Sequence, residues 1–130
     1  MPTFFISHSL ADAETAQTVR HALTEELHLE FVEPGPPEDG LALSIESQIQ
    51  DSDALIAIVS DEKSLWVERD IDLAERLGVP VVPVVVGSAK LPGKLAPSEA
   101  IRLDKPGLTS RLAKSLETAL SRKHVIAASA

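Results

Sequence analysis

The sequence predicts an α/β domain built as a three-layer sandwich, in which a five-stranded parallel sheet lies between helices on both faces. Short apolar runs alternate along the chain with segments whose apolar residues recur at helical spacing. The run 54–59 is apolar at every position, which is typical of a strand buried on both faces. Because parallel strands joined by helices need right-handed crossovers, the strand order 2-1-3-4-5 is the simplest arrangement.

Five apolar runs are predicted as strands. They are residues 4–6, 29–32, 54–59, 79–86 and 100–103. The fourth run is rich in valine, but it contains Pro80 and Pro83. Since proline has no N–H to donate, these residues favour a place near the start of the strand or at an edge of the sheet. The fifth run gives a weak signal.

Four segments with apolar residues at helical spacing are predicted as helices. The apolar positions are Ala16, Val19, Leu23 and Leu27 in the first segment, Leu41, Ile45 and Ile49 in the second, and Leu108, Leu112, Leu116 and Leu120 in the fourth. The third predicted helix covers residues 67–77. Ser9 and Asp12 have the spacing of a capping box at the start of the first helix, with Asp in place of the usual Glu. Gly78 is expected to end the third helix.

The composition fits one globular domain. The chain has 130 residues, of which 44% are hydrophobic and 25% charged, enough to build a core. We expect the domain to cover residues 1–123, with a frayed tail or the start of a linker at 124–130. Without cysteines there can be no disulfide and no thiolate metal site, and a cytoplasmic location is expected.

Charge argues against two classes of partner. The formal net charge is −8, and the basic residues are scattered, whereas nucleic-acid binding needs clustered Lys and Arg. No apolar run is long enough to cross a membrane, so no membrane partner is expected. The histidines show no pair at metal-ligand spacing, so we expect no metal site and no cofactor.

Asp70 breaks the pattern of the third helix. On a helical wheel it lies inside the apolar arc, between Leu77 and Ala74, while the other charged residues fill the opposite arc. Two structural interpretations are open: stabilisation near the helix N-terminus, or a buried acid bonded to the backbone amides of a neighbouring loop. The functional interpretation is a carboxylate beside a cleft at the carboxyl edge of the sheet. There it could bind a ribose hydroxyl or stabilise an oxocarbenium-like transition state.

Several short motifs, in order along the chain, resemble the TIR domain family from Phe4 to about Leu120. The first motif is Phe5-Ile6-Ser7-His8-Ser9 followed by Asp12, and the second is Asp39-Gly40 after a run of prolines, like the end of the BB loop. The third is Ser52-Asp53-Ala54, which leads into the family's third strand at 56–60. The fourth is the segment 64–71, followed by Ala74 and by the next strand at 81–84. The resemblance implies a flavodoxin-like fold, and the short form without cysteine looks bacterial. A phosphoacceptor receiver domain shares the strand order, but the stretch Ser7-His8-Ser9 lacks its paired acids.

The resemblance implies two possible activities. Some family members cleave NAD+ at the nicotinamide–ribose bond, giving ADP-ribose or cyclic isomers, with a glutamate four residues after the tryptophan. Asp70 stands at that position, four residues after Trp66. The side chain of aspartate is one methylene shorter than that of glutamate, which withdraws the carboxylate by about 1.5 Å. A misplacement of about 1 Å can cost roughly 10²-fold in rate. Other members are catalytically silent and signal by assembling with further TIR domains.

The candidate site follows from both arguments. Asp70 is the candidate catalytic residue, with NAD+ as substrate in bacterial defence or signalling. The candidate substrate-binding residues are Ser7, His8, Ser9, Gly40, Ser64 and Trp66. For Ser7 and His8, turn formation and helix capping are equally good interpretations. Trp66 fits a packing role better than a ligand platform.

Overall fold

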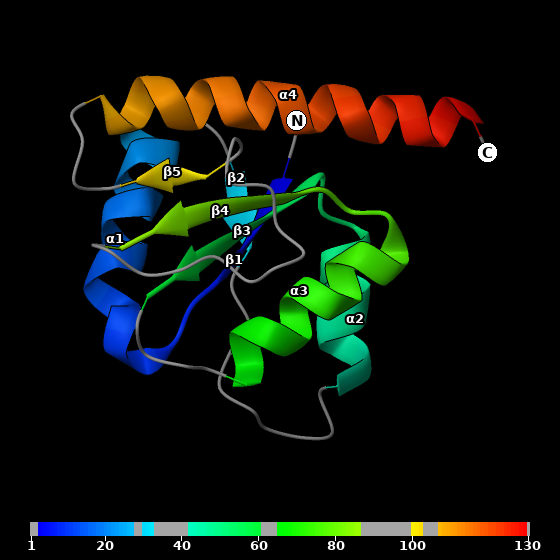
Figure 1. Cartoon of the computed structure of the whole chain (residues 1–130), viewed down its shortest axis with the longest axis horizontal. Helices are drawn as coiled ribbons and strands as arrows, with labels where there is room; N and C mark the ends of the chain where they lie inside the picture. Colours follow the sequence, from blue (N-terminus) through cyan, green and yellow to red (C-terminus); the bar gives the residue numbers. More distant parts are fainter. Residues whose placement is uncertain are drawn as a thin grey trace.

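The five strands form one parallel sheet in the order β2-β1-β3-β4-β5 (Figure 1). The computed structural model describes residues 3–27, 30–32, 42–60, 65–86, 100–102 and 107–129. The strands are β1 (Thr3–Ser7), β2 (Glu30–Val32), β3 (Ala54–Val59), β4 (Val81–Val85) and β5 (Ile101–Arg102). Each neighbouring pair is parallel, which confirms the predicted fold class and strand order.

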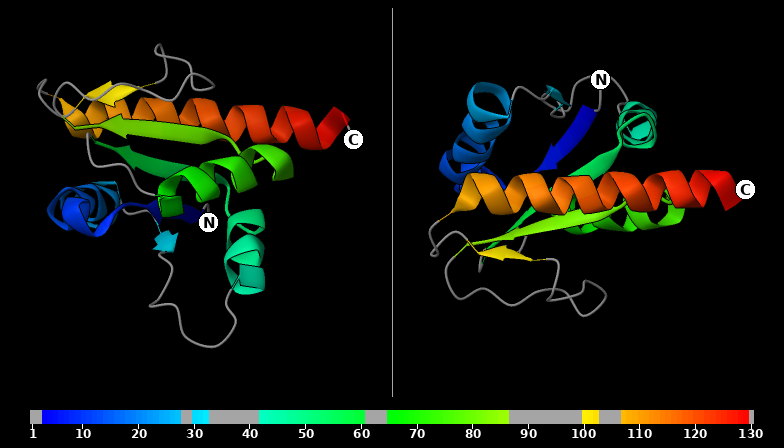
Figure 2. Two further views of the ribbon diagram at one scale, coloured as in Figure 1. Left: turned by 60° about the horizontal axis from the view of Figure 1, so that its bottom comes forward. Right: turned by 90° about the horizontal axis from the view of Figure 1, so that it is seen from above.

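Helices cover both faces of this sheet, as Figure 2 shows. They are α1 (Ala13–His21), α2 (Ala42–Gln50), α3 (Leu65–Leu77) and α4 (Leu108–Ser129). The 3-10 turn η1 (Leu10–Asp12) precedes α1, and the π-helical turn η2 (Ala22–Glu26) follows it. Residues of α1, η2 and α4 pack on one face of the sheet, and residues of α2 and α3 pack on the other.

The strand β3 lies at the centre of the core. All six of its residues are buried, and neighbouring residues point to opposite faces. Ile56 packs with the cluster of α1 and α4, whereas Leu55 packs with the cluster of α2 and α3. Burial on both faces explains why the sequence shows an unbroken apolar run here.

The placement of Pro83 corrects the expectation that its strand lies at an edge. Pro83 is in the middle of β4, which pairs with β3 on one side and β5 on the other. Val86 N donates to Val59 O of β3 at 2.8 Å, and alternate residues of a strand turn their backbone groups to opposite neighbours. The nitrogen of Pro83 therefore faces β5. Pro83 is the residue before Val84, whose pairing with Ile101 is the first between β4 and β5. Pro80 precedes the strand, as expected.

The helix α4 is longer than the sequence pattern suggested. It continues to Ser129, so most of the segment 124–130 is helical, and the view from above in Figure 2 shows this end beyond the strands. Whether this segment begins a linker stays a prediction. Arg111 Nη2 donates to the backbone oxygen of Arg102 at 2.7 Å, which ties the start of α4 to β5. Among the described helices, none has the length and apolar character that crossing a membrane requires.

Candidate functional site at the carboxyl edge of the sheet

The carboxylate of Asp70 is buried where β1 ends and α3 begins. The apolar residues of α3 pack on β1, β3 and β4, and Asp70 lies among them with 2% of its surface exposed. This confirms that the acid is on the inward face of the helix. Because parallel strands end at the same edge, the position lies in the region where ligands bind in sheets of this order.

Two side chains bind the carboxylate of Asp70. Ser7 Oγ, at the last residue of β1, donates to Oδ2 at 2.8 Å. Arg69 Nε and Nη2 donate to Oδ1 at 3.2 and 3.0 Å. The backbone-amide interpretation is therefore not what the described residues show, since a strand hydroxyl and a guanidinium hold the acid. The bond to Ser7 joins residues 63 apart in the sequence and fixes α3 against β1.

Burial dominates the electrostatics of Asp70. Removal of the carboxylate from water raises its pKa above the usual value of 3.8. The hydrogen bonds from Ser7 and Arg69, and the positive charge of Arg69, act in the opposite direction but do not cancel the effect of burial. Burial, the raised pKa and the position at the edge where ligands bind together make Asp70 a candidate functional residue.

A second acid, Asp12, lies at the same edge. It is 8% exposed, and its Oδ2 accepts hydrogen bonds from Ser9 Oγ at 2.9 Å and from Ser60 Oγ at 2.5 Å. Asp12 N also donates to Ser9 O at 3.1 Å. Ser60 directly follows β3, so Asp12 joins the loop after β1 to the end of the neighbouring strand.

This arrangement differs from the predicted capping box. The spacing of Ser9 and Asp12 is that of a cap, but the two side chains bond to each other, and Asp12 makes no side-chain bond to the helix backbone. Ser60 was not among the predicted site residues, although it ends the predicted motif 56–60. Its position immediately after a buried strand of a parallel sheet was the signal that could have found it.

The other predicted site residues are only partly placed. His8 follows β1, with Nδ1 at 2.8 Å from Ser9 O, so the structure brings Ser7, His8 and Ser9 together between the two acids. Trp66 is in the first turn of α3, but its side chain is outside the described part of the chain. Gly40 and Ser64 also lie outside it. Roles for these residues stay predictions.

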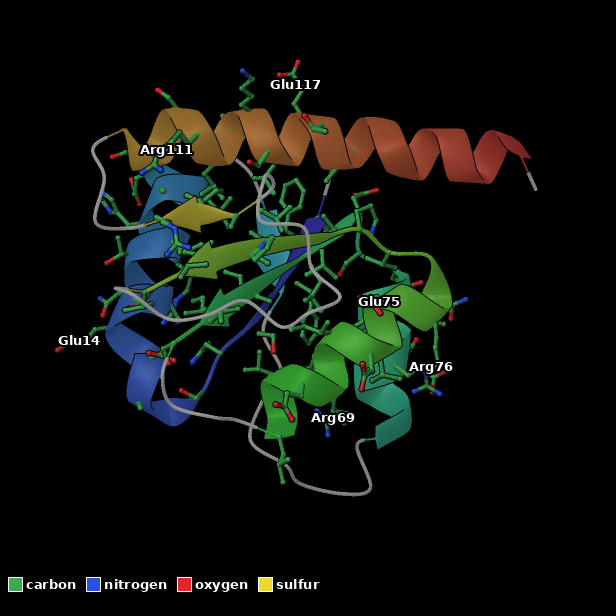
Figure 3. All side chains as sticks on the ribbon, in the orientation of Figure 1. Glu14, Arg69, Glu75, Arg76, Arg111 and Glu117 are labelled. Atoms are coloured by element: carbon green, nitrogen blue, oxygen red, sulfur yellow. The ribbon has the colours of Figure 1, made fainter. Side chains whose placement is uncertain are left out.

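Within the described part of the chain, neither a group of metal ligands nor the outer face of α3 offers an alternative site. No group of three or more acidic or histidine side chains in the described ranges could hold a metal ion. A shallow hollow on the outward face of α3 is lined by Asp72, Glu75 and Arg76. Figure 3 shows Glu75 and Arg76 on this helix. Its three lining residues belong to the charged arc of the helix, whereas Asp70 faces the sheet.

Comparison with known families identifies the class of protein. A family model described as TIR domain matches residues 4–125, which is nearly the whole chain. The chain therefore belongs to the TIR domain family. This agrees with the order of motifs and the observed strand order. The comparison with curated proteins gives no match.

Solved structures similar to this chain come from proteins of distant sequence. A CMP N-glycosidase of Clostridium botulinum is similar over 89% of this chain and 98% of its own, with 13% identity and a TM-score of 0.57. A response regulator receiver domain from Bacillus halodurans has 18% identity over 92% and 97% of the two chains, and a TM-score of 0.49. The TIR domains of the activated Roq1 resistosome have 14% identity over 96% and 85%, and a TM-score of 0.48.

Proposed function

We propose that this TIR domain hydrolyses the N-glycosidic bond of a pyridine nucleotide, with NAD+ as the substrate. The observation that carries the proposal is the carboxylate of Asp70, held by Ser7 at the carboxyl edge of the sheet. It stands four residues after Trp66, where the family's NAD+-cleaving members carry a glutamate. The C. botulinum protein of similar fold is described as a CMP N-glycosidase, so in that protein this fold carries cleavage of a nucleotide at its N-glycosidic bond.

The chemistry asks for a fixed negative charge beside the ribose. As the bond between C1′ and the nicotinamide nitrogen breaks, the bonding electrons leave with nicotinamide and positive charge develops on the sugar. An ionised carboxylate close to the ring stabilises that charge, and the hydrogen bond from Ser7 fixes its orientation before the reaction. Water then adds to C1′ and releases a proton, giving ADP-ribose. In this scheme Asp70 is the catalytic residue and Ser7 positions it.

Turnover of NAD+ by purified protein tests the proposal. The wild-type chain should release nicotinamide, measured by liquid chromatography, and Asp70→Asn should lower the rate by about 10²-fold or more, as for loss of a group that stabilises transition-state charge. Asp72→Asn is the matched control, because this exposed acid lies two residues further along the same helix. Asp70→Glu restores the family's side-chain length. No nicotinamide release by the wild type at high protein concentration would refute the proposal, whether or not Asp70→Glu is active.

A second candidate function is a catalytically silent module that signals by assembling with other TIR domains. The enclosure of Asp70 favours it, because both carboxylate oxygens already accept hydrogen bonds within the chain. This function predicts concentration-dependent assembly without NAD+ turnover, weakened by substitutions in the segment 34–40. Sedimentation that shows only monomer over the accessible concentration range would rule it out.

A further inference from the structure

Arg69 and Asp70 form an unusual ion pair, because they are neighbours on the same helix. Both Nη2 and Nε reach the single oxygen Oδ1, at 3.0 and 3.2 Å, rather than one nitrogen binding each carboxylate oxygen. The pair therefore lacks the parallel two-bond geometry that makes Arg–carboxylate contacts strong. Arg69 is 35% exposed while Asp70 is 2% exposed, so the pair joins a partly exposed cation to a buried carboxylate. Figure 3 shows Arg69 near the start of α3.

This ion pair opposes the chemistry proposed for Asp70. A positive charge about 3 Å from the carboxylate weakens its attraction for a second positive charge on the ribose, most strongly where water is excluded. Oδ1 is also occupied by the guanidinium. For Asp70 to act on the sugar, the pair has to open, and Arg69 needs another anionic partner to replace the carboxylate.

The substrate supplies such a partner. A pyridine nucleotide carries phosphate groups, and the planar fork of an arginine matches phosphate oxygens in both geometry and charge. The chain as a whole has a formal net charge of −8, so an anionic substrate needs a local cation at the site. Arg69 is a partly exposed cation directly beside the candidate catalytic group.

We propose that Arg69 binds a phosphate group of the pyridine nucleotide and, by leaving Asp70 to do so, frees Oδ1 for the ribose. The inference rests on the proposed function and names the substrate group that the site recognises. Oδ1 of Asp70 is thereby occupied by Arg69 in the free protein and released by substrates that carry phosphate. No covalent step is involved, since one ion pair replaces another.

A comparison of substrates with and without phosphate tests this role. For Arg69→Gln we expect KM for NAD+ to rise roughly ten- to a hundredfold, as for loss of a charge-assisted hydrogen bond. For nicotinamide riboside, which has the same scissile bond but no phosphate to replace Asp70 as the partner of Arg69, KM should not rise and kcat/KM should increase, because Oδ1 of Asp70 is no longer occupied. Arg69→Lys keeps the charge without the fork and should fall between. Arg76→Gln, which removes the same charge from the exposed face of α3, should behave as wild type.

Binding of ADP-ribose, measured by calorimetry, separates this inference from the proposed function. ADP-ribose keeps the phosphates but has no scissile nicotinamide bond, so its affinity should fall by a similar factor in Arg69→Gln even if the wild type does not cleave NAD+. In that case the phosphate site stands and the proposed function fails. Equal changes in KM for both substrates, or unchanged ADP-ribose affinity in Arg69→Gln, would overturn the role of Arg69 and leave the proposed function in place.

Discussion

Removal of the Ser7 hydroxyl is the perturbation whose effect the structure defines best. Ser7 Oγ donates to Asp70 Oδ2 at 2.8 Å, and the two residues are 1% and 2% exposed, so solvent cannot replace the lost bond without rearrangement. A hydrogen bond to a charged group contributes about 1.5–3 kcal/mol. Ser7→Ala should therefore lower the free energy of unfolding by about 2 kcal/mol near neutral pH, measured by urea denaturation.

The dependence of this loss on pH distinguishes a bond to the carboxylate from simple loss of packing. The Ser7 bond lowers the pKa of Asp70, so its deletion raises that pKa further. Below pH 3.8 the carboxyl group is protonated in both variants, and the loss should shrink to about 1 kcal/mol, as for a neutral hydrogen bond. Ser110→Ala, at an exposed position of α4, serves as control and should change stability by less than about 0.5 kcal/mol. A Ser7→Ala loss that is the same at both pH values would refute the reasoning.

Three further predictions address the acid, the core and a turn. Burial raises the pKa of Asp70 in the folded state, so the stabilising contribution of Asp70 relative to Asp70→Asn is complete below pH 3.8 and is lost as pH rises through the folded-state pKa. Unfolding curves of the two proteins at several pH values check this prediction, and a stabilising contribution of Asp70 that grows with pH would contradict it. Ile56→Ala, at a fully buried position of β3, should cost about 2–5 kcal/mol by denaturation, and a cost below about 1 kcal/mol would show that the core is not packed as described. Gly107 has φ of +83°, and a Cβ added there would meet no atom within 4 Å. Gly107→Ala should therefore lower the free energy of unfolding by about 1–2 kcal/mol through backbone strain alone, and an unchanged melting temperature would contradict this.

Much of the fold could be predicted because its strongest signals are local. The strand β3 has the predicted bounds, 54–59, since burial on both faces leaves a continuous apolar run between polar residues. The alternation of elements then determined the strand order. The π-helical turn η2 was not predicted, because the bond from Leu27 N to Ala22 O that closes it has no signature in residue type. The length of α4 was also missed, since its last turns depart from the regular leucine spacing.

The site was predictable in its centre but not in its contacts. The helical wheel placed Asp70 on the inward face from residue spacing alone, and the structure agrees. It assigned Arg69 to the solvent face, because a wheel records where a side chain starts and not how far it reaches. The contact between Asp12 and Ser60 joins residues 48 apart, so only the tertiary fold brings them together.

The pH profile of NAD+ turnover tests the central claim, that the ionised carboxylate of Asp70 drives cleavage of the glycosidic bond. The value of kcat/KM reports ionisations of the free protein. For the wild type it should fall in acid with a midpoint above 3.8, because burial raises the pKa of Asp70, and this acidic limb should be missing from the residual activity of Asp70→Asn. Turnover by Asp70→Asn at the wild-type rate, with the same acidic limb, would contradict the claim.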